Sequence, residues 1–276
     1  TFLFELLQGG STYFFNWSTF HGFDRETDFA IMFKKLGGDS LRIRDDIEAY
    51  MQSLRRWISD TKSIPLEEMN DFFTARIEGY EAHMSLWDEA YTVFADYLPL
   101  HCEKILDLGC GTGLELEAVF RRLPRVHVTG IDMTAEMLKA LQKKYTAQQV
   151  HCICGDYFQI PFGENSFDAV ISFESLHHFS PGKKQALFNK VFSSLKLGGI
   201  FLECDYIACC QEEETLLRDE CAARRAAAGV PENVFVHFDT PLTLEHEIRL
   251  LQAAGFCEID APKTINGATF VKALKK

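Results

Sequence analysis

The sequence predicts an α/β fold in which helices cover both faces of a mostly parallel sheet. Two observations lead to this prediction. From Ile105 onward, short apolar segments alternate with segments whose apolar residues recur at helical spacing. The first apolar segment also ends in a turn with glycine at positions 109, 111 and 113, directly before a helical segment. A chain of 276 residues has room for one large domain of this class and an appendage.

The first 66 residues are predicted to form a helical extension ahead of the main domain at residues 67–276. Residues 1–23 are rich in aromatic side chains. Helical spacing follows in residues 24–35 and 40–59, with the breaker sequence Gly37–Gly38–Asp39 between them.

A longer helical region is predicted over residues 69–98, with one break near Gly79. Its apolar residues fall largely on one stripe, which is typical of a helix packed against a core. Tyr80 and His83 are the polar exceptions. Because this region directly precedes the first strand of the main domain, we expect it to fold over the glycine turn.

The main domain is predicted to alternate strands and helices and to close with a hairpin. The strands are expected at residues 105–108, 126–132, 150–154, 167–173, 199–205, 256–259 and 268–274. The helices are expected at residues 114–123, 134–145 (with Thr134 as the cap), 183–195, 212–228 and 243–254. The nearly continuous apolar run at 167–173 is typical of a central strand that is buried on both faces.

The composition argues against several classes of protein. A net charge of −12 repels long polyanions, so nucleic acid is a poorer candidate ligand than a small molecule. No apolar run is long enough to span a membrane, and the first residues do not have the pattern of a signal peptide. The nine cysteines include no C-x-x-C pair, so we expect reduced thiols, a cytoplasmic location and no metal site.

Acidic side chains stand at or just after the ends of five predicted strands. They are Asp107, Asp132, Asp156, Glu174 and Asp205. A single carboxylate at such a position often caps a helix. Five of them beside a glycine turn are hard to explain as caps, and open parallel sheets bind ligands at the carboxyl ends of their strands. The sequence therefore predicts a ligand site at this edge of the sheet.

The spacing of these residues bears on the kind of nucleotide that would bind. Asp132 follows Gly109 by 23 residues, close to the ~20 at which such folds place an acid on ribose hydroxyls. A dinucleotide and an adenosyl group both fit that spacing. The dinucleotide pattern G-x-G-x-x-G needs glycine at position 114, where this chain has Leu114, so a pyrophosphate is less well served.

With these motifs the chain resembles the class I S-adenosylmethionine-dependent methyltransferases, especially the small-molecule branch of the ubiquinone/menaquinone-biosynthesis type (type 11). The resemblance covers residues 69–276. It rests on ILDLGCGTG (105–113), GID (130–132), GDYFQIPF (155–162), FDAVISFESLHHF (167–179) and LKLGGIFLECD (195–205). It implies a doubly wound, Rossmann-like sheet of seven strands in the order 3-2-1-4-5-7-6, with the last strand antiparallel.

The resemblance implies S-adenosyl-L-methionine as cofactor and S-adenosyl-L-homocysteine as product. The turn would approach the methionine part and the ribose, and the acids would hold the ammonium group, the ribose hydroxyls and the adenine amino group. The residues that the resemblance implies for these contacts are Tyr80, Asp107, Gly109, Cys110, Gly111, Gly113, Asp132, Met133, Asp156, Tyr157 and Phe173.

Methyl transfer from a sulfonium is an in-line displacement, so the protein mainly aligns the acceptor with the methyl group. A base is needed only when the acceptor arrives protonated. The candidates for this catalytic role are His177, His178 and Glu174, with Tyr206 and His237 further along the chain. The resemblance favours a structural role for one histidine of the LHHF motif.

We expect the acceptor, a small organic molecule, to bind between the N-terminal helices and residues 206–240, with residues 230–240 as a lid. Phe235, His237 and Phe238 would supply side chains to it. Two alternatives remain open: an RNA methyltransferase of the same fold, and a non-catalytic adenosyl-binding protein whose residues 1–66 bind a partner. The sequence leaves the oligomeric state open, with a homodimer as one option.

Overall fold

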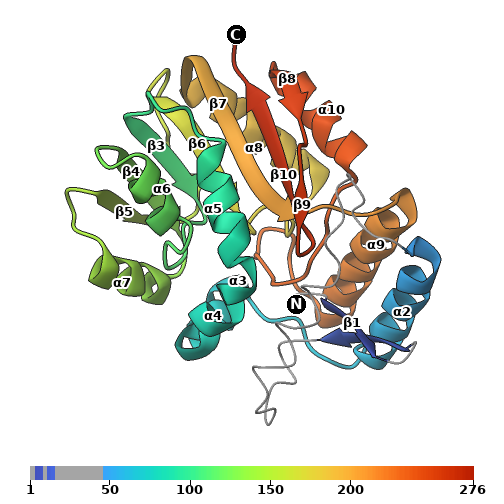
Figure 1. The fold of residues 1–276 in the computed structure, drawn as a ribbon. Coiled ribbons are helices and arrows are strands. Elements are labelled where there is room, and N and C mark those ends of the chain that lie inside the picture. The colour runs from blue at the N-terminus through green and yellow to red at the C-terminus, as the bar shows by residue number, and fades with distance from the viewer. Residues whose placement is uncertain (1–3, 9–10, 16–45) are drawn as a thin grey trace.

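A mixed β-sheet forms the centre of the molecule in the computed structural model, which describes residues 4–8, 11–15 and 46–276 (Figure 1). The strand order is β5-β4-β3-β6-β7-β10-β8, and a short strand, β9, pairs with β10 off this path. The strands are β3 (Lys104–Leu108), β4 (His127–Asp132), β5 (Val150–Cys154), β6 (Phe167–Phe173), β7 (Leu195–Tyr206), β8 (Cys257–Asp260), β9 (Thr264–Ile265) and β10 (Ala268–Leu274).

The order of these strands confirms the predicted topology. With β9 set aside and the strands from β3 to β10 numbered 1 to 7 along the chain, the order across the sheet is 3-2-1-4-5-7-6. Strands β3 to β7 pair in parallel, and β10 is antiparallel to β7. Parallel pairing brings the carboxyl ends of β3 to β7 to one edge of the sheet, where the predicted acids lie.

Helices cover both faces of the sheet. On one face, α5 (Asp88–Asp96), α6 (Leu116–Arg122) and α7 (Ala135–Lys144) share a core with strand residues such as Ile105 and Ile171. On the other face, α8 (Pro181–Ser194) and α10 (Leu244–Ala254) share a core with Leu106 and Val170. Figure 1 shows α5 in front of the sheet and α8 behind it. Successive side chains of β3 and of β6 point to opposite faces of the sheet, and both faces are covered by helices. Most positions along these strands are therefore buried, which explains their nearly continuous apolar sequences.

The helical region before β3 is broken at a different place from the one predicted. It consists of α3 (Met69–Ala75), α4 (Ile77–Met84), a 3-10 turn at Ser85–Trp87 and α5. Gly79 lies within α4, and the break falls at Arg76. The Arg76 guanidinium donates hydrogen bonds to Glu67 at 2.8 and 3.0 Å and to the Phe72 carbonyl at 3.0 Å. These tertiary contacts fix the break and override the weak local effect of a glycine.

The end of the chain forms the predicted antiparallel pair, β8 with β10, together with the strand β9 that was not predicted. β9 and β10 are joined by Asn266 and Gly267, which both have positive φ (49° and 84°). Two-residue hairpin turns of the I′ type need positive φ at both positions, and Asn-Gly supplies it at low cost.

The N-terminal part contains a β-ribbon as well as a helix. Strands β1 (Phe4–Gln8) and β2 (Ser11–Phe15) pair antiparallel, which the helical pattern did not predict. The predicted helix at residues 24–35 lies outside the described residues. Within the predicted helix at residues 40–59, the structure describes α2 (Ile47–Asp60).

Helix α2 packs against the C-terminal half of the chain. Its residues Leu54 and Trp57 share a third core with Leu217 of α9 (Gln211–Ala228) and with Phe238 of the following segment. Figure 1 shows α2 and α9 next to one another, away from the central sheet. The extension therefore supports the segment that was predicted to be a lid.

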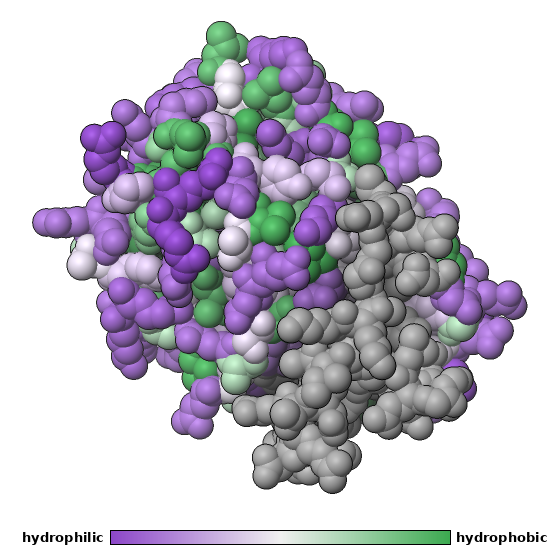
Figure 2. Space-filling model, in the orientation of Figure 1, coloured by the Kyte–Doolittle hydropathy of each residue, from purple (hydrophilic) through white to green (hydrophobic). Residues whose placement is uncertain are grey.

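Hydrophilic residues predominate on the face drawn in Figure 2, and hydrophobic residues form small separate groups there. Among the described residues, no helix combines the length and the apolar character that a membrane crossing requires. All nine cysteines lie in the described part of the chain, and each has a free thiol.

Candidate functional site

A cleft of about 610 Å³ opens at the carboxyl ends of β3, β4 and β6, as the positions of the strand-end acids predicted. Its wall includes the following residues that the sequence singled out for cofactor binding or catalysis: Tyr80, Gly109, Gly111, Asp132, Met133, Asp156, Tyr157, Phe173, Glu174 and His178. Four others, Asp107, Cys110, Gly113 and His177, lie behind the wall.

The glycine turn forms the floor of the cleft, and two of its glycines are required there. Gly109 has φ 74°, and a Cβ at this position would lie 2.1 Å from the hydroxyl oxygen of Ser175. Gly111 has φ 47°, and a Cβ would lie 3.4 Å from the hydroxyl oxygen of Tyr80. Side chains would therefore be strained at both positions and would fill the space in which a ligand could meet the backbone.

The third glycine of the turn, Gly113, is required for a different reason. Gly113 has φ 70°, and a Cβ there would lie 3.1–3.2 Å from Leu116, Leu141 and Tyr145. These side chains belong to the packing of α6 and α7 against the sheet. Gly113 thus permits close packing behind the turn, and the structure does not place it in the cleft wall.

Asp132 ends β4 and joins the turn to the next helix. One carboxylate oxygen accepts a hydrogen bond from the Gly111 N–H at 3.0 Å, and the other accepts one from the Thr134 N–H at 2.7 Å. Burial raises the pKa of Asp132, although these two N–H groups act in the opposite direction. Each oxygen keeps a lone pair, so the carboxylate can also accept hydrogen bonds from a ligand hydroxyl in the cleft. Thr134 occupies the predicted cap position but makes no side-chain cap bond.

Asp107 and Cys110 lie beneath the turn. Burial, and next the charge of the neighbouring Glu115, raise the pKa of Asp107 well above its usual value. The thiol of Cys110 packs against Gly130, where a Cβ would lie 2.7 Å from the sulfur. Both residues shape the turn from behind.

An aromatic wall stands opposite the turn. Phe158 lies 4.7 Å from Phe179 and 5.7 Å from Phe235, measured between ring centroids. Tyr157 contacts the Ser175 hydroxyl at 3.2 Å, and Asp156 accepts a hydrogen bond from the Phe158 N–H at 2.7 Å.

Phe235, which was predicted for the acceptor side, lines this cleft. Other residues of the wall were not predicted as site residues: Met69, Phe73, Thr134, Met137, Gly155, Phe158, Ser175 and Phe179. Of these, Gly155 and Phe158 stand inside the motif GDYFQIPF, and Ser175 and Phe179 inside FDAVISFESLHHF. Their positions within those motifs were therefore the available signal.

Met69 and Phe235 reach the cleft because their backbones pair. The Met69 N–H donates to the Phe235 carbonyl at 3.0 Å, and the His237 N–H donates to the Glu67 carbonyl at 3.0 Å. Residues 67–69 and 235–237 thus form a short antiparallel bridge. The start of α3 and the predicted lid segment are fastened together at the cleft.

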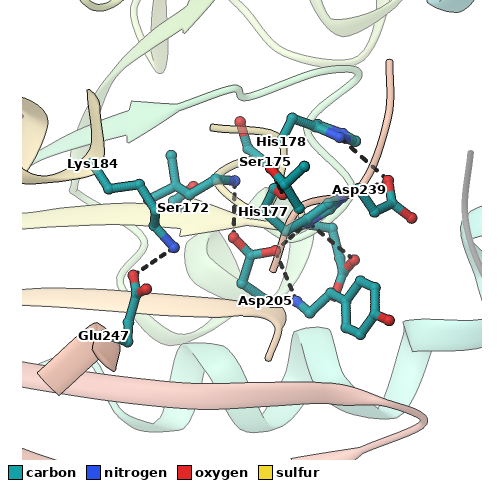
Figure 3. A network of polar contacts seen from close by, with 12 residues as sticks. Ser172, Ser175, His177, His178, Lys184, Asp205, Asp239 and Glu247 are labelled. Carbon is teal, nitrogen blue, oxygen red and sulfur yellow. Dashed lines mark hydrogen bonds and ion pairs between the residues drawn. The ribbon is translucent and has the colours of Figure 1, made fainter. Parts of the chain in front are cut away.

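The two histidines of the LHHF motif have different environments. The His177 ring is fully buried and donates from Nδ1 to Asp205, at the end of β7. His178 is a residue of the cleft wall, but its side chain is only 2% exposed, with Nδ1 3.3 Å from Asp239 (Figure 3). Burial opposes protonation of His177, but Asp205 outweighs it and raises the pKa to about 9. Burial, and next the charge of His177, lower the pKa of His178 to about 4.

Glu174 adds a strained acid to the wall. Its φ of 49° is uncommon for a residue with a side chain, and strained positions cluster at functional sites. Its N–H donates to the Cys204 carbonyl at 2.8 Å, which holds the end of β6 to β7. Burial raises the pKa of Glu174 well above its usual value, even though His177 lies nearby.

Two further base candidates are not in the cleft wall. The ring of His237 stacks on Phe72 with the centroids 3.5 Å apart. The hydroxyl of Tyr206 donates to a carboxylate oxygen of Glu213 and lies 2.9 Å from the hydroxyl of Tyr50, so it joins β7 to α9 and α2. Both side chains serve packing between elements. His83, which was noted with Tyr80, is also outside the wall.

An open backbone turn, an acid at the end of the next strand and an aromatic wall meet at the edge of the sheet where open α/β folds bind ligands. Comparisons with known proteins identify the class of protein. Residues 105–199 match the protein family described as "Methyltransferase domain". This part of the chain is therefore a class I S-adenosylmethionine-dependent methyltransferase domain, a class whose methyl donor is S-adenosylmethionine.

Individual relatives are distant. The malonyl-(acyl-carrier protein) O-methyltransferase of Priestia megaterium is 30% identical over 98 residues, which are 36% of this chain and 35% of that protein. The O-methyltransferase cnsE of Penicillium expansum is 28% identical over 215 residues, 70% of this chain and 71% of that protein. The chain thus spans about a third of the length of the first relative and 71% of the second.

Solved structures share the fold. An O-methyltransferase family protein from Burkholderia thailandensis superposes with a TM-score of 0.60 at 17% identity, covering 83% of this chain and 71% of that one. At this identity the likeness shows the fold alone, over a larger part of the chain than residues 105–199.

Proposed function

We propose that this chain transfers the methyl group of S-adenosylmethionine to a small organic acceptor, as in the branch of the ubiquinone/menaquinone-biosynthesis type. The observation that carries the proposal is the meeting of Gly109, Gly111 and Asp132 at one wall of the cleft. Open backbone at two glycines and a carboxylate beside them suit a ligand that has both an amino-acid part and ribose hydroxyls.

The cofactor would be held mainly by residues of the wall. Gly109 and Gly111 would face its methionine part, Asp132 its ribose, and Asp156 with Met133 its adenine. Bound there, it supplies an activated methyl group on a sulfonium. The chain's own contribution is to orient the acceptor and to exclude water, which alone can account for a large rate enhancement.

The acceptor would bind on the side of Phe73, His178 and Phe235. This part of the wall is apolar apart from the histidine and Glu174, which is typical of a pocket for a small molecule. We propose that residues 1–66 belong to the acceptor side, because α2 packs on Phe238 and so supports the segment that carries Phe235.

The three predicted catalytic residues would have separate roles. His178 and Glu174 are the ones in the wall and would contact the acceptor. His177 lies behind them, held by Asp205, and would position its neighbours. Its burial supports the structural role that the LHHF resemblance favoured for one histidine.

Calorimetry with S-adenosylmethionine and with NAD tests the first half of this proposal. We expect binding of S-adenosylmethionine with a micromolar Kd and no binding of NAD. Tight NAD binding without adenosyl binding would reject the proposal. A screen of a metabolite extract with isotopically labelled methyl donor then identifies the acceptor.

The same labelled donor separates the alternatives. The net charge of −12 supports a small molecule over RNA, and nine free thiols support a cytoplasmic location. Label in total RNA instead of metabolites would favour an RNA methyltransferase. Cofactor binding without label in either pool would favour a non-catalytic protein.

A further inference from the structure

Three side chains from two distant segments converge at the end of β6. His177 and His178 follow the strand, and Asp239 comes from the segment between α9 and α10 (Figure 3). One oxygen of Asp239 lies 3.3 Å from Nδ1 of His178 and 3.6 Å from Nε2 of His177. We propose that His177, His178 and Asp239 form a binding site for one divalent transition-metal ion. The spacing of the cysteines predicted no metal site, and these three residues were not considered as ligands.

The two distances from Asp239 fit ligands around one ion. Bonds of about 2.0–2.2 Å at tetrahedral angles place ligand atoms about 3.3–3.6 Å apart. The oxygen of Asp239 lies at such distances from both rings, and the three ligand atoms all lie within 4.8 Å of one another.

A second layer of contacts orients these residues. Asp205 binds Nδ1 of His177, which turns Nε2 toward Asp239. Asp205 is itself held by the N–H groups of Leu176 and Tyr206, both at 2.8 Å. A carboxylate on the far nitrogen of a histidine is the usual arrangement behind a metal ligand.

The two segments are also fastened together by backbone. The Thr240 N–H donates to the His177 carbonyl at 2.7 Å, and its hydroxyl reaches the same oxygen at 3.2 Å. Asp239 is therefore fixed beside the histidines by the next residue along the chain. A site held on both sides in this way needs little rearrangement to bind an ion.

A neighbouring set of residues is a weaker candidate. Glu174, His177 and Asp205 also lie close together, with Glu174 3.8 Å from Nδ1 of His177. An ion bound by Glu174, His177 and Asp205 would have to use Nδ1 of His177, which already donates to Asp205. An ion bound by His177, His178 and Asp239 would use Nε2 of His177 and leave the hydrogen bond to Asp205 intact.

The ligand set indicates which ion would bind. Two imidazoles and one carboxylate favour Zn²⁺, Co²⁺, Ni²⁺, Fe²⁺ or Mn²⁺ over Ca²⁺ and Mg²⁺, which prefer oxygen. Three protein ligands leave a fourth position on the ion. The side chains of His178 and Asp239 are 2% and 1% exposed, so the ion would lie behind the wall of the cleft.

Metal binding is tested on the full chain without a polyhistidine tag, after dialysis against a chelator. We expect titration with Zn²⁺ to give one bound ion per chain, and Co²⁺ to give a visible absorption band from nitrogen and oxygen ligands. His178→Ala and Asp239→Ala should abolish the bound ion. Asp205→Asn should weaken it by about 10- to 100-fold, as loss of an outer contact does.

A matched control is available in the same part of the chain. His246 lies 2.8 Å from Glu214, a histidine–carboxylate pair without a third ligand, so His246→Ala should keep one ion per chain. Circular dichroism establishes that each variant is folded. If the wild type binds no ion, or His178→Ala and a folded Asp239→Ala bind as the wild type does, the three residues form a hydrogen-bonded cluster only and the proposal is overturned.

Calorimetry with S-adenosylmethionine on the same samples keeps the two proposals separate. An ion bound without cofactor affinity would reject the proposed function and leave the metal site standing. Binding of S-adenosylmethionine without a bound ion would reject the metal site and leave the proposed function standing.

Discussion

Two buried polar clusters lie on the same side of β7, and they differ in what surrounds them. Asp205 belongs to the cluster that reaches the cleft through His177 and His178. Glu203, two residues earlier, lies beside Lys184 of α8 and Glu247 of α10, an ion pair at 2.6 Å whose side chains are 1% and 0% exposed. Figure 3 shows both clusters in one view.

The comparison teaches that burial and charge alone do not mark a functional site. The Lys184 cluster is sealed between two helices and the sheet, and none of its members lines the cleft. The His178 cluster has one member in the wall. Substitutions in the sealed cluster should therefore change stability without changing ligand binding, and substitutions around the cleft should do the opposite.

The largest effect is expected for Lys184→Met. Removing one partner of a buried ion pair leaves Glu247 without its counter-charge and costs about 3–5 kcal/mol of unfolding free energy. Urea unfolding measures it. Lys139→Met, which removes a surface ion pair on α7, is the matched control and should cost under about 1 kcal/mol. Equal stability of the two variants, or a changed affinity of folded Lys184→Met for the cofactor, would contradict the contrast between the clusters.

The next effect is expected for Gly109→Ala. Its methyl group would meet the Ser175 hydroxyl in a backbone conformation that disfavours side chains, so the floor of the cleft must shift. A misplacement of about 1 Å can cost about 100-fold, and we expect a loss of this size in S-adenosylmethionine affinity by calorimetry. Gly229→Ala has the same sign of φ (65°) and nothing within 4 Å. Gly229→Ala should lower the free energy of unfolding but keep the affinity for S-adenosylmethionine. A loss of affinity in both variants would mean that backbone strain in general, and not the contact with Ser175, weakens binding.

A smaller effect on binding is expected for Asp132→Ala. Hydrogen bonds to a charged group are worth about 1.5–3 kcal/mol, which corresponds to a 10- to 100-fold weaker Kd for the cofactor. His178→Ala should weaken this Kd less, because its ring lies on the acceptor side. The reverse order in calorimetry would exchange the two assigned roles.

The smallest effect is expected for Glu203→Gln, as a function of pH. Burial, and next Glu247, raise the pKa of Glu203 well above the usual 4.5, so the folded state keeps a proton that the unfolded chain releases. Stability from this proton is complete below pH 4.5 and falls as the pH rises toward the folded-state pKa. Glutamine needs no proton, so the variant should gain on the order of 1 kcal/mol relative to the wild type between pH 5 and 8.

Urea unfolding at several pH values measures this gain. Glu245→Gln changes an exposed acid on α10 and should show no such trend. A constant difference between Glu203→Gln and the wild type across this pH range would mean that Glu203 is ionised in the folded protein.

The central sheet could be predicted because its signals are local. β5, β6 and β10 have the predicted bounds, since each is an apolar run between turn residues. The break at Arg76 could not be predicted, because it depends on a contact with Glu67 that only the folded chain makes. β9 was missed because a two-residue strand carries almost no pattern.

The same distinction applies to the site. Asp132, Asp156 and Glu174 reach the cleft because a strand end fixes where each one lies. Asp239 was not predicted as a site residue, because it stands far along the chain from His178 in a segment without regular structure. Only the return of that segment to the end of β6, through the bond from Thr240 to His177, brings it there.

The packing of α2 has a practical consequence for dividing the chain. A protein shortened to residues 67–276 would uncover Leu217, Val236 and Phe238, which are at most 4% exposed in the full chain. An apolar area of this kind in water promotes self-association. Truncation before Met69 should therefore yield aggregates during purification, and crystallisation trials are better served by a chain that includes α2.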